Sequence, residues 1–183
     1  LKLDALRILL RTGQPGQAAI PTTAATCDNT LLGSIQFAQQ TAPATSYLGI
    51  VEALCTNAGT TLEVHDRLMH MGGLNGTLLT AQTVNLGLFA SLASDNLDAR
   101  KGDANFSDVQ WWMEWYSTTG ATLSNATINV LYNDGTSGDL TVIAVGGTIR
   151  ASRLISLNGL VPSSASGKFI KGINNVTLSA STG

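Results

Sequence analysis

The residues best suited to chemistry lie in one short segment that carries both histidines of the chain. His65, Asp66, Arg67 and His70 fall within six residues. Imidazole and carboxylate groups can bind zinc, but a zinc site needs three or four ligands that converge on one point. Residues 65 and 70 point to opposite faces of a strand, and a five-residue spacing also diverges in a helix. We therefore expect no metal site, and we expect Asp66 and Arg67 to close a hairpin with hydrogen bonds.

Other catalytic and ligand-binding patterns are weak in this sequence. The chain has 15 serines but no G-x-S-x-G motif, and its glycine pairs lack the lysine and helix of a phosphate-binding loop. We expect no catalytic residue and no cofactor. The polar stretch 95–108 offers oxygen ligands of the kind that calcium prefers, but a solvated loop is favoured because their spacing does not match a helix–loop–helix site. These residues are Asp95, Asp98, Asp103, Asn105 and Asp108.

An aromatic run at residues 111–116 is the sharpest local feature of the sequence. Strand alternation places Trp111, Met113 and Trp115 on one face, which we assign to the core. The opposite face carries Trp112 and Tyr116 on either side of a glutamate. Exposed aromatic side chains anchor protein interfaces and also stack on sugars. We favour a protein interface or a core position for this face, and keep a sugar-binding platform as the alternative.

The N-terminal part of the chain differs from the rest. Leu3, Leu6 and Leu10 recur at helical spacing over residues 1–12, and Gly13 is a natural stop. So short a helix is unstable alone, so we expect its leucines to dock on a neighbouring surface. A stretch rich in Gly, Pro, Thr and Ala follows, and it is typical of an extended arm. The sequence thus predicts a helix and arm over residues 1–46.

Residues 47–183 have the pattern of a β-domain. No proline occurs between residues 44 and 161, as expected of a strand ladder, in which proline cannot donate a hydrogen bond. A hairpin is predicted from residues 47–55 and 61–69, and residues 72–88 form a loop that leads into another strand. Seven or eight short strands with frequent turns favour a β-sandwich or barrel. The remaining predicted strands are 109–118, 126–132, 140–145, 149–157 and 176–180.

Composition excludes several classes of partner. Apolar residues make up 44% of the chain and charged residues only 12%, with 22 Thr and 15 Ser supplying polarity. The ten Lys and Arg residues are scattered and the net charge is −2, so we expect no nucleic-acid binding. No run of about 20 apolar residues indicates a membrane span. Cys27 and Cys55 are expected to be small buried thiols rather than a disulfide, although a bond is possible if they meet.

Three segments resemble proteins of tailed-bacteriophage particles. Residues 65–85 (HDRLMHMGGLNGTLLTAQTVN) are similar to a D-R-L-x-H-x-G-G-L-x-G-T segment of such proteins. Residues 111–138 resemble a later acidic–aromatic strand with its Thr-rich partner, and residues 173–183 resemble their C-terminal strand. The resemblance covers roughly residues 47–183 and implies a virion location without implying any catalytic residue.

These observations lead to one expectation for fold and function. We expect a mainly β chain with a single β-sandwich, for which a jelly roll is one candidate topology, and a short N-terminal helix and extended arm. The chain would be a capsid decoration or cement protein that binds capsid or other virion proteins and forms a homo-oligomer, with a trimer favoured. Each added interface would raise the cost of opening the shell. A tail or collar protein, and a carbohydrate- or host-receptor-binding module, are the alternatives.

Overall fold

The computed structural model describes residues 25–27, 40–44, 66–86, 101–151 and 153–183. The predicted N-terminal helix, with Leu3, Leu6 and Leu10, lies outside the described residues, as does the first strand of the predicted hairpin. The described part is mainly β, and all its strand pairs are antiparallel, which confirms the predicted class. Its strands are β1 (Ala25–Thr26), β2 (Met69–His70), β3 (Gln82–Leu86), β4 (Trp112–Glu114), β5 (Asn125–Tyr132), β6 (Ser137–Asp139), β7 (Ile143–Ala144), β8 (Leu154–Ser156) and β9 (Ile170–Leu178).

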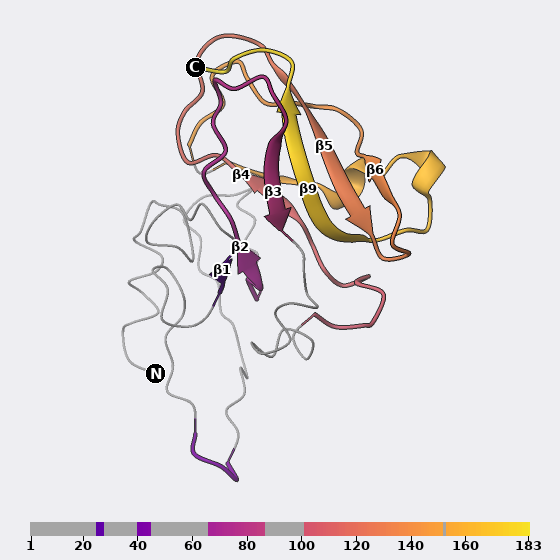
Figure 1. Ribbon diagram of the computed structural model, residues 1–183. Coiled ribbons are helices and arrows are strands. Elements are labelled where there is room, and N and C mark those ends of the chain that lie inside the picture. Colours follow the sequence, from indigo (N-terminus) through magenta and orange to yellow (C-terminus); the bar gives the residue numbers. More distant parts are fainter. Residues whose placement is uncertain (1–24, 28–39, 45–65, 87–100, 152) are drawn as a thin grey trace, which may run out of the picture.

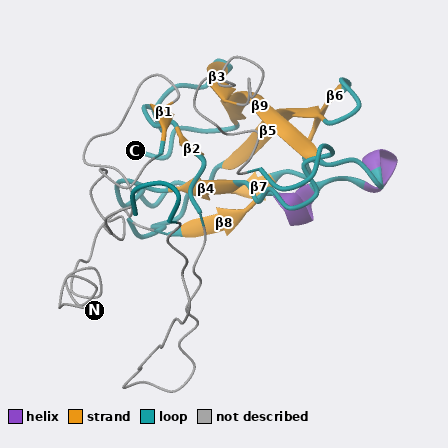
Figure 2. Ribbon diagram, turned by 90° about the horizontal axis from the view of Figure 1, so that it is seen from below, coloured by secondary structure: helices purple, strands orange, loops and turns teal. Residues whose placement is uncertain are grey.

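The largest sheet is built around β5 and β9. Its strands follow the order β3-β9-β5-β6, and β7 also pairs with β5 (Figure 1). Two smaller pairs, β1 with β2 and β4 with β8, complete the described strands. Figure 2 shows β4 and β8 as a separate pair beneath the strands of the larger sheet. Two short 3-10 turns, Asn158–Leu160 and Ser163–Ala165, connect β8 to β9.

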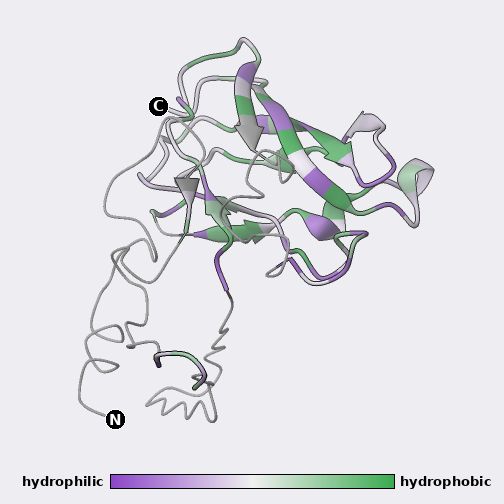
Figure 3. Ribbon diagram, turned by 60° about the horizontal axis from the view of Figure 1, so that its bottom comes forward, coloured by the Kyte–Doolittle hydropathy of each residue, from purple (hydrophilic) through white to green (hydrophobic). Residues whose placement is uncertain are grey.

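Strand β5 follows the alternation that its sequence predicts. Ala126, Ile128, Val130 and Tyr132 are all buried, and the residues between them are more exposed. The same alternation of hydrophobic and hydrophilic residues is visible along the larger sheet in Figure 3. One face of β5 therefore supplies a row of core side chains.

Strand β9 keeps its apolar residues on that same face through two irregularities. From Ile128 to Tyr132, β5 advances four residues, while its partner β9 covers six, from Val176 to Ile170. Residues three apart would point to opposite faces of a regular strand. The extra residue in each bulge turns the next apolar side chain back to the core face. As a result Ile170, Ile173 and Val176 are all buried although they are three residues apart.

The aromatic strand β4 is held at both ends beyond its three ladder residues. The Leu157 N–H donates to the Trp111 carbonyl (2.8 Å), and the Trp115 N–H donates to the Arg153 carbonyl (3.1 Å). The Asn158 side chain accepts from the Trp111 N–H at 2.7 Å. Strand β4 is therefore shorter than the predicted strand 109–118. At Trp111 the backbone N–H bonds to the Asn158 side chain in place of a neighbouring strand.

The predicted core face of the aromatic run is confirmed. Trp111 and Trp115 are buried in the same hydrophobic cluster as the inner residues of β5 and β9, and Met113 packs against it. Each indole N–H donates to a backbone carbonyl, that of Ile170 for Trp111 (2.8 Å) and that of Val145 for Trp115 (3.4 Å). The two rings therefore join the short strand pair to the larger sheet.

The predicted hairpin strand 61–69 is wrong in its described part. Residues 66–68 are not in a strand, and only Met69 belongs to β2, which pairs with Ala25 and Thr26. The Cys27 N–H extends this contact by donating to the Leu68 carbonyl at 2.9 Å. Local turn signals could not reveal a partner more than 40 residues away. Cys27 is buried as expected, whereas Cys55 lies outside the described residues.

Candidate functional site

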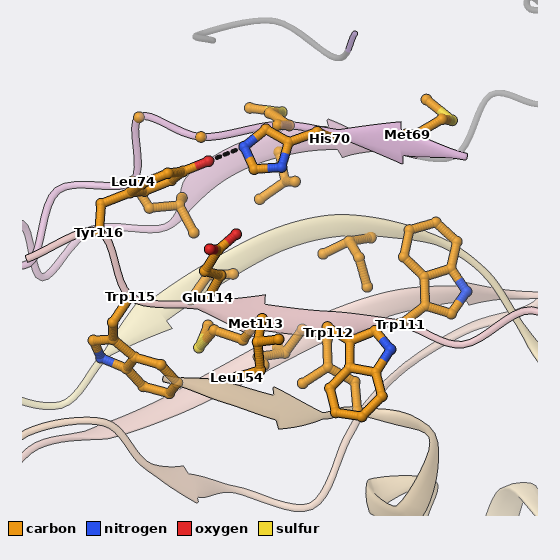
Figure 4. Close-up of a pocket in the computed structure, with 18 of the residues that line it drawn as sticks. Met69, His70, Leu74, Trp111, Trp112, Met113, Glu114, Trp115, Tyr116 and Leu154 are labelled. Carbon is orange, nitrogen blue, oxygen red and sulfur yellow. Dashed lines mark hydrogen bonds between the residues drawn. The ribbon is translucent and has the colours of Figure 1, made fainter. Parts of the chain in front are cut away.

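A cavity of about 970 Å³ lies where residues 66–76, the aromatic strand β4 and the inner faces of β5 and β9 come together. Its walls are largely apolar, and all three tryptophans of the chain line it. The polar side chains that line it come in part from the segments that carried the candidate chemistry in the sequence, and include those of Arg67, His70, Glu114 and Tyr116. Figure 4 shows His70, Glu114 and Tyr116.

Glu114 and Arg67 form a buried ion pair across two segments. The Arg67 Nη2 donates to Glu114 Oε2 at 3.1 Å. The Glu114 side chain is only 7% exposed and that of Arg67 is 20% exposed. The second carboxylate oxygen, Glu114 Oε1, is buried and has no hydrogen-bond partner among the described residues. The site therefore presents an unsatisfied acceptor that is more than nine-tenths buried.

His70 links this ion pair to Tyr116. The Arg67 Nη1 lies 3.1 Å from His70 Nδ1, and the Tyr116 hydroxyl contacts His70 Nε2, as Figure 4 shows. The two rings also meet edge to face, with centroids 5.6 Å apart. Because a guanidinium can only donate, Nδ1 must accept, and the neutral imidazole carries its hydrogen on Nε2. His70 therefore donates to the Tyr116 oxygen and leaves the hydroxyl hydrogen available.

The environment of His70 keeps the imidazole neutral. Burial, and then the nearby positive charge of Arg67, lower the pKa of His70 to about 4. Both effects disfavour the imidazolium. At neutral pH the His70 ring therefore carries no charge beside the Arg67–Glu114 ion pair.

This pKa predicts that the protein loses stability on mild acidification. Between pH 6.5 and 5 an unfolded histidine takes up a proton that folded His70 refuses, so the free energy of unfolding falls as the pH drops through this window. We expect a loss of about 2 kcal/mol between these two values, measured by urea denaturation. Above about pH 7.5 the histidine is neutral in both states and contributes no slope. A His70→Gln variant with an unchanged slope would contradict this assignment.

The predicted interface residues of the aromatic run are only partly exposed. Trp112 and Tyr116 are both half-buried and both line the cavity. Glu114, which shares their face, lies between β4 and the segment that carries His70 (Figure 4). That segment therefore covers part of the face that the sequence left open. The remaining predicted interface residues, Leu3, Leu6 and Leu10, lie outside the described residues.

Two other sequence-based expectations have different outcomes in the structure. Arg67 does not simply close a local hairpin, because its guanidinium reaches Glu114, 47 positions along the chain.

In the acidic stretch, the Asp103 carboxylate accepts from the N–H groups of Asn105 and Ser107. The bond from the Ser107 N–H is the main reason why the pKa of Asp103 is lowered. Among the described residues no group of three His, Cys, Asp or Glu side chains is placed to hold a metal ion. Asp103 thus organises a turn of its own loop.

A second candidate surface is a loop with an exposed apolar tip. Leu74, Leu78 and Leu79 are 42%, 47% and 51% exposed. The loop is fixed by a reciprocal pair, in which the Asn75 N–H donates to Gln82 Oε1 (2.7 Å) and Gln82 Nε2 donates to the Asn75 carbonyl (2.9 Å). The leucines are therefore displayed on an ordered frame. The pair of adjacent leucines between turn-forming residues was the signal in the sequence that could have identified it.

Thr182 fixes the same loop from the other end of the chain. Its N–H donates to the Gly76 carbonyl at 2.7 Å, and its own carbonyl accepts from the Gly120 N–H at 2.6 Å. A Cβ atom at position 76 would collide with the Thr182 hydroxyl, so a larger residue there would force the Thr182 side chain to move. Three segments distant in sequence thus brace the base of the apolar loop.

No protein-family model, curated protein or solved structure matches this chain. In the described part of the chain, no helix is long and apolar enough to cross a membrane.

Proposed function

We propose that this chain is a structural subunit of a tailed-phage particle, a capsid decoration or cement protein that works through subunit–subunit contacts. The observation that carries the proposal is the leucine loop, in which Leu74, Leu78 and Leu79 are exposed on a hydrogen-bonded frame. Ordered apolar side chains of this kind lose little entropy when a partner covers them. The loop also lies inside residues 65–85, where the resemblance to virion proteins is strongest.

The proposed partner of the leucine loop is a second copy of this chain in a trimer on the particle surface. Low charge favours such a contact, because few ionic groups have to be desolvated when two copies meet. The exposed leucines would supply the apolar centre of the interface. The proposed architecture is a β-sandwich, with the larger sheet and the β4–β8 pair as its two layers. A tail or collar position would use the same contacts.

Sedimentation velocity tests this proposal with paired variants. We expect the wild-type chain to sediment as a trimer at micromolar concentration, and Leu78→Asp to shift it toward monomer. Loss of one buried leucine weakens association by about tenfold to a hundredfold at each interface.

Val142→Asp is the matched control, since Val142 is 53% exposed but lies outside the loop. It should leave the trimer intact. A wild-type chain that remains a compact monomer would refute the proposed interface. Counting the copies of this chain in purified particles then tests the virion location, and its absence from particles would refute that part.

A further inference from the structure

The chain contains the tripeptide Leu-Asn-Gly twice, and the fold places the two copies in different surroundings. The copies are residues 74–76 and 157–159. A side-chain amide is attacked most readily by the next backbone nitrogen when that nitrogen belongs to glycine, which has no Cβ to hinder the approach. Since the residues on either side are the same, a difference in reactivity between Asn75 and Asn158 must come from the structure.

Asn158 is held at both ends of its side-chain amide. Its Oδ1 accepts from the Trp111 N–H (2.7 Å), and its Nδ2 donates to the Val109 carbonyl (2.9 Å). The residue is half-buried, and it lies in the 3-10 turn that follows β8. The amide of Asn158 therefore cannot rotate toward the Gly159 nitrogen without breaking both bonds.

Asn75 has the opposite arrangement, because its side chain curls forward along the chain. Its Oδ1 accepts from the Thr77 N–H (2.9 Å) and from the Thr77 hydroxyl (2.8 Å). The amide carbon is thereby held over the peptide bond of Gly76, which lies between the two bonded residues. The two donors also stabilise the negative charge that Oδ1 gains when the carbon is attacked, as donors in an oxyanion hole do.

The attacking and leaving groups at Asn75 are both free to react. Asn75 is exposed, and among the described residues the Gly76 N–H donates no hydrogen bond. In the same part of the chain, Asn75 Nδ2 has no hydrogen-bond partner. Hydroxide can therefore take the proton of the Gly76 nitrogen, and ammonia can leave from Nδ2.

The geometry points to a self-modification site at Asn75, where the Gly76 nitrogen and water convert the side-chain amide to a carboxylate. The nitrogen, having lost its proton to hydroxide, forms a bond to Asn75 Cγ. The Cγ–Nδ2 bond then breaks, and Nδ2 takes a proton from water and leaves as ammonia. Water adds to either carbonyl carbon of the resulting succinimide and opens the ring to aspartate or isoaspartate. Each product carries one new negative charge.

A second turn of the chain shows that the aspartate product fits the fold. Asp134 is followed by glycine and threonine, as Asn75 is. Asp134 Oδ1 accepts from the Thr136 N–H (2.9 Å) and from the Thr136 hydroxyl (2.7 Å). A carboxylate at position 75 can thus keep the turn that the amide makes.

The isoaspartate product does not fit so easily. It sends the backbone through the side chain of residue 75 and lengthens it by one carbon before Gly76. The Asn75 carbonyl is held by Gln82 and the Gly76 carbonyl by Thr182, so this product must shift the frame of the leucine loop. The reaction does not rest on the proposed trimer, because every reacting atom of the protein belongs to residues 75–77 of one copy.

Peptide mapping by mass spectrometry tests the inference on the full chain, kept folded in mildly alkaline buffer at physiological temperature. The reference is the same chain unfolded in guanidinium chloride, in which the two tripeptides should react alike. We expect folded Asn75 to convert about as fast as in the unfolded chain, and folded Asn158 to convert at least about tenfold more slowly than in the unfolded chain. Methylation by protein isoaspartyl methyltransferase identifies the isoaspartate fraction.

Asn75→Gln is the matched variant, because its longer side chain would have to close a larger and less favourable ring. It should remove the main acidic species that the folded wild type accumulates on isoelectric focusing. Asn105→Gln is the control, since Asn105 is exposed but precedes Phe106, and it should leave that species unchanged. Equal protection of Asn75 and Asn158 in the folded wild type would overturn the inference, as would faster conversion of Asn158. The wild-type comparison decides even where a variant does not fold.

Discussion

Replacing Trp115 with alanine is expected to lower the free energy of unfolding by about 3–5 kcal/mol, the cost of removing a large aromatic side chain from a packed core. Trp115 is only 8% exposed and packs in the main hydrophobic cluster. Its indole N–H also donates to the Val145 carbonyl, which would lose that partner. Chemical denaturation followed by far-ultraviolet circular dichroism measures the change. Such a loss is a large part of the total stability of an ordinary domain.

Trp112→Ala is the control for this experiment. Its side chain has the same chemistry but is half-buried, on the face opposite Trp115. We expect a smaller loss than at Trp115, because a larger part of the Trp112 side chain meets solvent. The reverse order of effects would mean that the strand is placed one residue out of register.

Replacing Arg67 with methionine is expected to destabilise the protein by about 3 kcal/mol, because it leaves the buried Glu114 carboxylate without its counter-ion. Methionine keeps most of the apolar stem, so the loss reports the charge and the hydrogen bonds of the guanidinium rather than the packing. A double variant, Arg67→Met with Glu114→Leu, should recover much of the loss, since no unpaired charge then remains. Thermal and urea unfolding of the four proteins complete the cycle.

The exposed ion pair of Lys168 with Asp134 is the control for the buried one. Lys168 Nζ lies 2.9 Å from Asp134 Oδ2, but the two side chains are 32% and 41% exposed, far more than that of Glu114. The hydrogen bond from Lys168 lowers the pKa of Asp134 to about 2, and Lys168→Met should still leave the unfolding midpoint nearly unchanged. If Lys168→Met and Arg67→Met lowered the free energy of unfolding equally, burial of the Arg67–Glu114 pair would contribute nothing to stability.

The sequence predicted those parts of the fold that depend on local alternation. Strand β5 was expected at residues 126–132 and occupies Asn125–Tyr132. The division of the aromatic run into a core face and an opposite face is likewise correct for Trp111 and Trp115. Both predictions needed only the period of two that every strand imposes on its side chains.

The parts that the sequence did not predict depend on contacts between distant segments. Strand β9 was expected only over residues 176–180, because its two bulges and the residues Gly172, Asn174 and Asn175 hide the alternation. The pairing of Arg67 with Glu114 was missed because Asp66 offered a nearer acidic partner. A lone glutamate within an aromatic run was the available signal, since burial obliges such a charge to find a counter-ion.

The central position of β9 has a consequence for how the chain acquires its fold. Gln82 of β3 pairs with Val176, and Ile128 of β5 pairs with the same residue from the other side. During synthesis the edges of β3 and β5 that face β9 therefore stay open until β9 is made, and β9 begins 38 residues after β5 ends. Sheets closed by such long-range pairing fold slowly and expose edges that can join other chains. Within the described strands, Asn174 and Asn175 interrupt the apolar sequence of β9, which would limit that hazard.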